Sequence, residues 1–487
     1  MSPPKRNLLL ILTDQHRTDA IGCYGSKVCK SPNIDRLASE GVTFDKAYTT
    51  CSLCSPARAS IMTGQWPHTH GMVNNAEKAC PSWPAAEAPG ADMRELELRP
   101  DLLSEILKGA GFNLGYVGKW HMGEEVLPRD FGFEGDNFPG HGGGGFNYPE
   151  YAEYLKRRAL SYEIRRLPRV PFYGHQAGVF EGPIEATVPH FLAENTNTLL
   201  ERFSSDWRKH GKPFFIWCNF WGPHPPYYAP EEFVAMYRDA DIPPWKNFED
   251  SLEGKPAIQR DIIPVGRRHQ PWSFWRERIV YYYAFATLID HQIGRMLDHL
   301  KELGLEEDTE VIFSADHGES LGIHGGLSDK TCFMYEENYH IPLIVKDPAL
   351  GSRRGTRDDH FVSLADIMPT LLEAAGSTPP ETVQGRSLRP LLEETPPTRW
   401  REHLTAEARG FTRLYPQRMI RYDRYKYVYN ADGLDEFYDL DSDPYELDNR
   451  ISNPDYSPVI EEMQIRLFNW MTETKDVLAS RLRCKWV

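Results

Sequence analysis

The chain has 487 residues, 40% of them hydrophobic and 26% charged, a composition typical of a globular protein with one large α/β domain and a smaller one. Its formal net charge of −15 at pH 7 excludes the global basic field of a nucleic-acid-binding protein. An anionic substrate would therefore need a local basic pocket.

The first predicted element is a strand at 7–13, where the sequence NLLLILT is continuously apolar. Such a run is typical of a strand buried on both faces in a parallel sheet. It is too short for a signal sequence or a membrane span, because Asp14 follows at once. Asp14 and Gln15 stand at the carboxyl end of this strand, where open α/β sheets bind ligands. From position alone, Asp14 is either a helix cap or a metal ligand.

A helix at 34–39 and a strand at 42–48 lead to the sequence CSPARASIMTG, which begins at Cys54. It predicts a short helix with Pro56 in its first turn and Gly64 at its end. Cys54 would then lie at the helix N-terminus, where free amide hydrogens favour anions, and Arg58 one turn further on the same face. The alternative is a buried apolar cysteine with a solvated arginine.

Two further strands end in short polar turns. A helix at 101–109 and a strand at 113–117 precede GKWHMG, which carries Lys119 and His121. Taken alone, this sequence indicates a surface turn with a packed tryptophan. A helix at 191–210 and a strand at 214–219 precede GPHPPY, which carries His224.

A long helix at 274–303 and a strand at 310–315 precede Asp316 and His317, and Lys330 follows shortly after. Asp316 and His317 could form a capped turn with a core histidine. Beside Asp14 they suggest the other half of a metal site, because parallel strands deliver their carboxyl ends to one crevice.

The C-terminal part changes character after a strand at 340–345 and a helix at 366–375. Residues 376–399 are rich in proline, threonine and glutamate, so we predict a catalytic domain at 1–397 and a subdomain at 398–487. The subdomain contains strand-forming residues at 418–429 and 435–440 and a helix at 460–474. The eight cysteines show no paired framework, so we expect reduced thiols and a cytoplasmic location.

The string C-S-P-A-R-A-S-I-M-T-G resembles the signature of type I sulfatases, and G-K-W-H-x-G, the turn at His224, D-H-G-E and D-x-D-P-x-E-L-x-N resemble further motifs of that family. The resemblance runs from residue 7 to about 475. It is weakest in two irregular stretches at 124–190 and 239–272. It implies an alkaline-phosphatase-like α/β fold: a mixed, mostly parallel sheet with helices on both faces, plus a small C-terminal α+β subdomain.

The resemblance also implies a chemistry. Cys54 would be oxidised by a maturation enzyme to formylglycine, whose hydrate attacks sulfur. One divalent cation would be held by Asp14, Gln15, oxidised Cys54, Asp316 and His317, and calcium is the usual cation of this family. The imidazole leaves manganese, zinc or iron open. The groups expected to neutralise charge in the transition state are Arg58, Lys119, His121, His224 and Lys330. Either His224 or His121 would protonate the leaving alcohol.

The predicted function is hydrolysis of a sulfate monoester, either a sulfated carbohydrate or an aryl or alkyl sulfate. The alternative within the superfamily is a phosphonate monoester or phosphodiester hydrolase. Such enzymes share Pro56-Ala57-Arg58 and Asp14-Gln15, but they differ at Lys119 and His121. A third interpretation is a non-catalytic binding protein with this fold. It is disfavoured because a suitable polar residue is present at every position where the family's motifs require one. We expect no nucleic-acid or membrane partner. The leaving group and the oligomeric state stay open.

Overall fold

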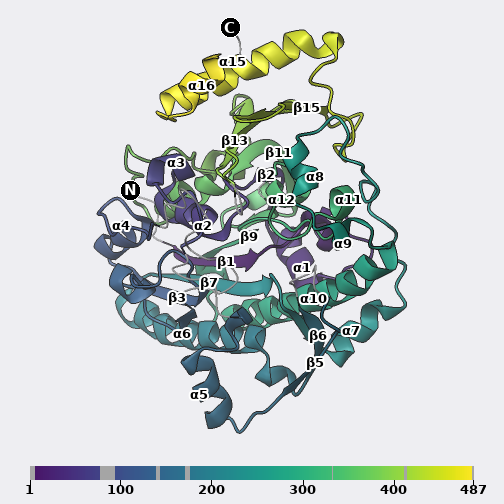
Figure 1. The fold of residues 1–487 in the computed structure, drawn as a ribbon. Coiled ribbons are helices and arrows are strands. Elements are labelled where there is room, and N and C mark those ends of the chain that lie inside the picture. The colour runs from purple at the N-terminus through teal and green to yellow at the C-terminus, as the bar shows by residue number, and fades with distance from the viewer. Residues whose placement is uncertain are drawn as a thin grey trace.

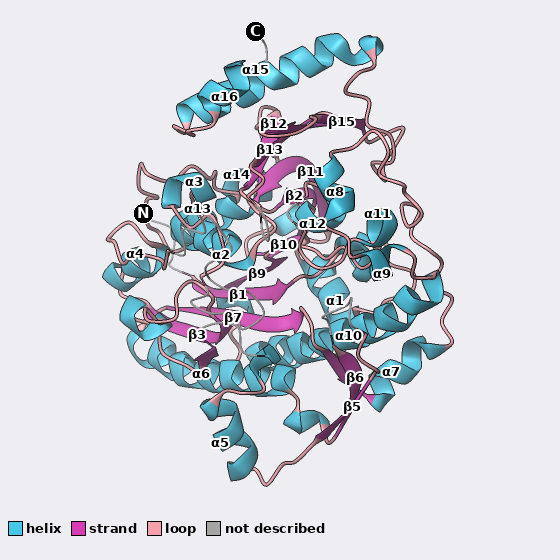
Figure 2. Ribbon diagram, in the orientation of Figure 1, coloured by secondary structure: helices cyan, strands magenta, loops and turns pink. Residues whose placement is uncertain are grey.

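The computed structural model describes residues 6–76, 94–138, 143–170, 176–331, 333–410 and 414–484. Within these residues the chain forms an eight-stranded sheet, a four-stranded sheet and a three-stranded sheet. Figure 1 and Figure 2 show the large sheet in the middle of the molecule, between two groups of helices. The four-stranded sheet and two C-terminal helices lie at the top of the same view.

The large sheet is mixed but mostly parallel. Of its eight strands only β10 runs antiparallel to its neighbours. In spatial order the strands are β11 (Thr356–Ser363), β2 (Val42–Tyr48), β10 (Leu343–Lys346), β9 (Thr309–Ala315), β1 (Asn7–Asp14), β7 (Phe214–Pro223), β3 (Asn113–Lys119) and β4 (Asn137–Phe138).

The continuous apolar run of β1 has a direct structural cause. Side chains alternate between the faces of a strand, so an uninterrupted run is stable only where both faces are covered. Leu9 and Ile11 belong to one hydrophobic core, and Leu8 and Leu10 belong to another, all of them fully buried. The predicted two-sided burial of this strand is confirmed.

Helices supply the other half of each core. The helices that contribute to the core of Leu9 and Ile11 include α1 (Pro32–Glu40), α6 (Val188–His210) and α10 (Trp272–Glu302). The helices that contribute to the core of Leu8 and Leu10 are α2 (Cys54–Thr63), α4 (Leu103–Gly109), α13 (Ile367–Ala374) and α14 (Arg389–Leu392).

The four-stranded sheet is an antiparallel meander in which each strand pairs with the next one in the chain. Ile420 and Tyr427 on one face pack with Met463 of the C-terminal helix, whereas Met419 and Val428 on the other face belong to a core shared with the large domain. The elements are β12 (His403–Ala408), β13 (Gln417–Tyr422), β14 (Tyr425–Asn430), β15 (Glu436–Asp439), α15 (Ser457–Glu473) and α16 (Ala479–Cys484).

The remaining elements belong to connections and insertions. The three-stranded sheet consists of β5 (Glu163–Arg166), β6 (Ala177–Glu181) and β8 (Tyr227–Pro230). The short helices are α3 (Pro67–His70), α5 (Pro149–Arg157), α7 (Glu231–Arg238), α8 (Ala257–Asp261), α9 (Val265–Arg268), α11 (Ile323–Gly326) and α12 (Glu336–Tyr339).

Several predicted boundaries shift in the structure. The strand predicted at 340–345 begins only at Leu343, because His340 forms just an isolated bridge to Tyr48. The run at 418–429 is two strands of a hairpin, since Asp423 and Arg424 make a turn, with Asp423 in the left-handed region. Strand β3 extends to Lys119 because β4 pairs with its end.

The described cysteines whose side chains can be followed, Cys23, Cys29, Cys51, Cys54 and Cys218, are free thiols, as expected. The prediction for Cys80 and Cys332, and for the side chain of Cys484, lies outside the described residues. None of the described helices combines the length and the apolarity needed to cross a membrane.

Candidate active site and metal centre

One edge of the large sheet collects the polar residues predicted from the sequence. Asp14 is the last residue of β1, and Gln15 follows it. Asp316 and His317 come directly after β9. These two strands are parallel neighbours, and Thr13 of β1 lies opposite Ala315 of β9. Parallel neighbours present their carboxyl ends at the same edge, so the two pairs meet.

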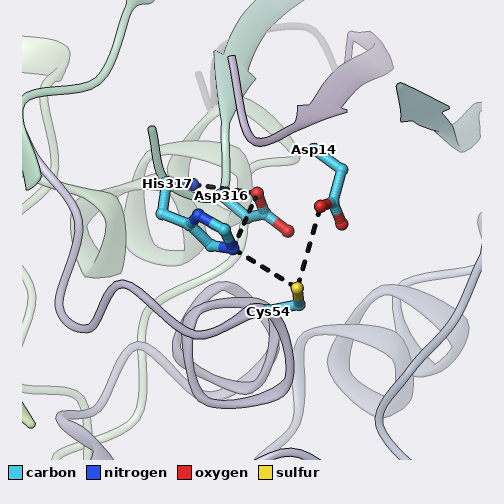
Figure 3. Close-up of side chains that lie close together, drawn as sticks. All are labelled: Asp14, Cys54, Asp316 and His317. Carbon is cyan, nitrogen blue, oxygen red and sulfur yellow. Dashed lines mark hydrogen bonds and ion pairs between the residues drawn. The ribbon is translucent and has the colours of Figure 1, made fainter. Parts of the chain in front are cut away.

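Cys54 faces these strand ends from the N-terminus of α2, where it is the first helical residue after the N-cap Leu53. Figure 3 shows its sulfur pointing between Asp14 and His317. The Cys54 Sγ atom lies 3.7 Å from Asp14 Oδ1 and 3.3 Å from His317 Nε2. One ligand-type atom from each of Asp14, Cys54, Asp316 and His317 lies within 4.8 Å of the others, and all four residues are buried.

Two lysines approach the same sulfur atom. Lys119 Nζ lies 3.4 Å and Lys330 Nζ 3.2 Å from Cys54 Sγ. Lys119 also donates to Asp14 Oδ2 at 2.7 Å, and its ammonium lies 4.6 Å from the centre of the Trp221 ring. Lys330 contacts His224 Nε2 at 3.0 Å. Any anion held at the Cys54 position would therefore have two ammonium groups beside it.

Arg58 is fully buried, which excludes the solvated-arginine alternative. Its Nη2 lies 2.9 Å from Asp14 Oδ2 and 3.0 Å from Asp316 Oδ2, so one guanidinium bridges both aspartates. A bridging guanidinium fixes the orientation of both carboxylates and offsets their mutual repulsion.

The charges in this cluster shift one another's titration. Burial alone would raise the pKa of Asp14, but the charges of Lys119 and Arg58 hold it well below its usual value. Burial and the neighbouring Asp14 raise the pKa of Asp316. Burial works against the protonated form of His317, yet Asp316 and Cys54 raise its pKa to about 9. Two carboxylates this close to each other are the usual setting for a bound cation.

The donor set fits a divalent cation. His317 Nδ1 lies 2.9 Å from the carbonyl of Gly318, so in the neutral ring Nδ1 carries the hydrogen and Nε2 keeps its lone pair toward Cys54 and Asp316. Asp14 Oδ1 faces the same space. The Gln15 carbonyl oxygen is nearby, 3.4 Å from Lys330 Nζ. Asp14, Gln15, Asp316 and His317 thus offer three oxygen-bearing side chains and one imidazole.

Gln15 and His121 both have backbone conformations that non-glycine residues rarely adopt, with φ of 58° and 56°. The backbone amide of Gln15 donates to Asp316 Oδ1 at 3.2 Å, which ties the two strand ends together. His121 is buried, and its carbonyl accepts from Ser55 Oγ in the first turn of α2. The backbone carbonyl of His121 thus contacts the first turn of α2, whereas the side chain of Lys119 contacts Asp14 and Cys54.

Sequence reasoning missed four residues that touch this cluster. Asn219 Oδ1 accepts from Arg58 Nη1 at 2.8 Å. Glu319 and Asp329 both accept from Gln15 Nε2, and Trp221 lies against Lys119. Asn219 carried a usable signal, because it is a polar residue at the end of a buried run, as Asp14 is. Asp329 lies in a loop and carried no such signal.

Comparisons with known proteins agree with this geometry. The sequence matches the Sulfatase family over residues 6–377 and the family described as N-sulphoglucosamine sulphohydrolase, C-terminal, over residues 322–473. It is 28% identical to an ulvan-active sulfatase of Formosa agariphila, over 98% of this chain and 83% of that protein. It is 30% identical to an arylsulfatase of Clostridium perfringens, over 94% of this chain and 93% of that protein.

Among solved structures, a phosphonate monoester hydrolase of Agrobacterium radiobacter superposes with a TM-score of 0.78 at 24% identity, over 96% of each chain. At this identity the similarity shows a shared fold. It confirms the alkaline-phosphatase-like architecture with its C-terminal antiparallel sheet.

Proposed function

The chain belongs to the sulfatase family of sulfuric ester hydrolases, and we propose that it removes sulfate from a sulfated carbohydrate through a formylglycine made from Cys54. The observation that carries this proposal is the environment of Cys54 Sγ. The atom lies between a buried aspartate–histidine cluster and two ammonium groups, Lys119 at 3.4 Å and Lys330 at 3.2 Å. Such a site places a nucleophile and the charges that stabilise an anionic transition state in contact.

We propose that a maturation enzyme oxidises Cys54 to the aldehyde. One hydroxyl of the hydrated aldehyde then gives up its proton and attacks sulfur, and the bond from sulfur to the leaving alcohol breaks, which leaves the sulfate on residue 54. The second hydroxyl then gives up its proton and re-forms the aldehyde as the bond from carbon to the sulfate oxygen breaks, which releases inorganic sulfate. Lys119 and Lys330 hold the sulfate oxygens, while Arg58 keeps both aspartates ionised and oriented.

A divalent cation, calcium in the first instance, would be held by Asp14, Gln15, Asp316 and His317 together with the modified residue 54. When bound, such a cation polarises the sulfate oxygens and favours the ionised nucleophile. The identity of the metal is part of the proposal.

The leaving alcohol needs a proton, and His224 with Lys330 forms the pair that we propose to supply it. His224 Nδ1 lies 2.7 Å from the carbonyl of Pro225, so Nδ1 carries the hydrogen and Nε2 accepts from Lys330 at 3.0 Å. Burial and the charges of Lys330 and Lys119 lower the pKa of His224 well below its usual value. A ring with a lowered pKa does not retain a proton at Nε2, so a proton that Lys330 passes to Nε2 goes on to the leaving oxygen, which is far more basic once its bond to sulfur breaks.

We propose a sulfated carbohydrate as the substrate because the ulvan-active sulfatase aligns with 98% of this chain at 28% identity. The phosphonate monoester hydrolase remains the second candidate, since that structure has the same fold. We propose that Lys119 favours the sulfatase, because an ammonium 3.4 Å from Cys54 Sγ would take up room that the second organic substituent of a phosphodiester needs.

Two measurements test the proposal. Mass spectrometry of the peptide that carries Cys54 should show the mass of the aldehyde in active protein, and hydrolysis of 4-nitrophenyl sulfate should exceed hydrolysis of an aryl phosphonate monoester. Cys54→Ala should abolish turnover, whereas Cys23→Ala, at a partly exposed free thiol, should retain it. An active enzyme with only the unmodified thiol would disprove the aldehyde. Faster phosphonate hydrolysis would favour the second candidate.

A further inference from the structure

A cavity of about 390 Å³ lies between α3 and the four-stranded sheet, and its lining residues include none of the residues predicted for the active site. Figure 2 shows α3 beside this sheet, below α15 and α16. The charged residues that line it are His68, Arg94, Glu407, Arg409, Arg418 and Lys475. Five of these six are basic side chains, although the whole chain carries a net charge of −15.

Part of this charge is neutralised within the wall. His68 Nδ1 lies 2.5 Å from Glu407 Oε2, and Arg418 Nη2 donates to Asp476 Oδ1 at 3.1 Å. His68, Glu407 and Asp476 are residue types that can hold a metal ion, and they lie close enough together to do so. Their carboxylate oxygens, however, already accept from His68 and Arg418, so this group is better explained as a structural ion-pair network.

Two cationic side chains in the wall of the cavity have no acidic partner among the described residues. Neither Arg409 nor Lys475 forms an ion pair with any residue that the structure describes. In a chain with 70 Asp and Glu side chains and 55 Lys and Arg side chains, acidic partners are abundant. Two unpaired cations in one concave surface create a local positive potential, which favours binding of an anion.

A short segment of the chain runs from the wall of the cavity to the helix that carries Cys54. Gly71 and Val73 line the cavity. Two residues further on, Asn75 Oδ1 accepts from the backbone amide of Ser55 at 3.1 Å, in the first turn of α2. Two residues span at most about 7 Å of extended chain. The cavity wall therefore lies close to the helix end that presents Cys54.

We propose that this cavity binds a second acidic group, a sulfate or a carboxylate, of a polyanionic saccharide whose scissile sulfate lies at Cys54. The inference rests on the proposed sulfatase function and deepens it, because it assigns the substrate to saccharides with at least two acidic groups. Arg409 and Lys475 form charge-assisted contacts with the second group. They would raise the affinity for the polyanion without touching the reacting sulfur.

The test compares two substrates in one double variant. The substrates are 4-nitrophenyl sulfate, which has one acidic group, and disulfated disaccharides cut from heparin, chondroitin sulfate and ulvan. We expect the Arg409→Gln, Lys475→Gln variant to lower the ratio of kcat/KM for the disulfated disaccharide that the enzyme hydrolyses over kcat/KM for the aryl sulfate about tenfold, through KM, which corresponds to about 1.4 kcal/mol. Because neither side chain is paired, the variant should fold like the wild type, which its thermal unfolding midpoint checks.

The matched control removes two lysine charges elsewhere. Lys209→Gln, Lys212→Gln alters exposed side chains at and beyond the end of α6 and should keep the wild-type ratio. An unchanged ratio in the Arg409, Lys475 variant would overturn the inference, and so would hydrolysis of the aryl sulfate with none of the disaccharides. Absence of any sulfatase activity in the wild type would instead overturn the proposed function.

A free anion is the other source of the same chemistry. If inorganic sulfate changes the kcat of the wild type on the aryl sulfate but not that of the variant, while the substrate ratio is equal in both, the cavity is an effector site. That outcome would overturn the assignment to a substrate group.

Discussion

The side chain of Lys119 makes three contacts in the candidate active site. It neutralises Asp14 at 2.7 Å, it lies 3.4 Å from the nucleophile position, and its ammonium rests on the ring of Trp221. The neighbouring Trp120 is buried in the hydrophobic core against Tyr116 and Phe131. The turn therefore separates its residues, with the tryptophan in the core and the lysine in the site.

Replacing Lys119 with alanine should lower kcat/KM on an aryl sulfate by at least roughly tenfold, because one charge-assisted hydrogen bond to the sulfate is lost. Hydrolysis of a phosphodiester should fall less, because the smaller side chain gives room to the second substituent. Steady-state kinetics on both substrates measures the effect. Lys156→Ala, at an exposed position of α5, is the control and should behave like the wild type. A sharper loss on the phosphodiester would reverse the order of the two candidate functions.

At the residue scale, the placement of a side chain in the site was predictable where a polar residue interrupts or follows an apolar run, whereas its chemical role remains a prediction. Asp14, Asp316 and Lys119 stand at strand ends, so their convergence followed from the periodicity of the strands and from the topology of parallel sheets. The contacts of Arg58 could not be predicted in the same way. Its partners Asp14, Asp316 and Asn219 come from three separate strands, and only the folded structure shows that one guanidinium reaches all of them.

At the scale of elements, the site depends on two neighbouring strands and one helix. The pairing of Thr13 with Ala315 aligns the ends of β1 and β9, and α2 points its first residue at them. Each strand end contributes one carboxylate to the candidate metal site, and Arg58 of α2 bridges the two carboxylates. Loss of either carboxylate should therefore disturb the whole centre.

Asp14→Asn and Asp316→Asn should each lower the bound divalent metal per protein chain, as well as the rate of sulfate hydrolysis. An amide is a weaker ligand than a carboxylate for a hard cation, and it carries no charge. Elemental analysis of the purified protein measures the metal independently of activity. Asp241→Asn, at an exposed position in the insertion, should keep the wild-type metal content. Full occupancy in both site variants would show that the two strand ends do not share an ion.

Element boundaries were harder to predict than the existence of elements. The long helix predicted at 274–303 is α10, shifted by at most two residues, because its apolar pattern persists over many turns. The strand predicted at 340–345 was too long by three residues at its start. Tyr339 and Ile341 form backbone hydrogen bonds with the end of β2, but these make only the isolated bridge between His340 and Tyr48 and no continuous ladder. The apolar pattern of a sequence does not distinguish an isolated bridge from a strand.

At the scale of the whole molecule, the four-stranded sheet is attached to the large domain by both apolar and charged contacts. Met419 and Val428 share a hydrophobic core with Tyr48 and Phe361. The predicted division at residue 397 and the cytoplasmic location remain predictions. The extent of these contacts nevertheless indicates that the C-terminal sheet stabilises the body that carries the active site.

The charged part of this interface centres on Lys426, which is fully buried. Its Nζ lies 2.7 Å from Glu446 Oε1 and 2.7 Å from Glu336 Oε1. Glu446 belongs to the motif D-x-D-P-x-E-L-x-N, and its other oxygen accepts from the backbone amide of Glu336 in α12. The motif thus has a structural role, because it supplies the carboxylate that joins the C-terminal segment to the large domain.

Replacing Lys426 with methionine should lower the free energy of unfolding by about 3 to 5 kcal/mol, because two buried carboxylates lose their shared cation. The loss should grow as pH rises. Burial and the neighbouring Glu336 already raise the pKa of Glu446 to about 7, although Lys426 opposes them. Without the lysine, that pKa rises further above its value in the unfolded chain. Between about pH 4.5 and its folded-state pKa, the folded protein binds a proton that the unfolded chain has released, so stability falls as pH rises. In the wild type this fall ends near pH 7, whereas in the variant it continues, so the deficit of the variant grows above about pH 7.

Urea unfolding of Lys426→Met at pH 5 and pH 8 measures both effects against the wild type. The matched control is Arg424→Met, which breaks the partly exposed pair with Asp439, at 3.2 Å, on the same sheet. A surface pair of this kind contributes about 1 kcal/mol or less, so the control should unfold close to the wild type at both pH values. If the deficit of Lys426→Met were equal at pH 5 and pH 8, the lysine would not be what keeps Glu446 ionised.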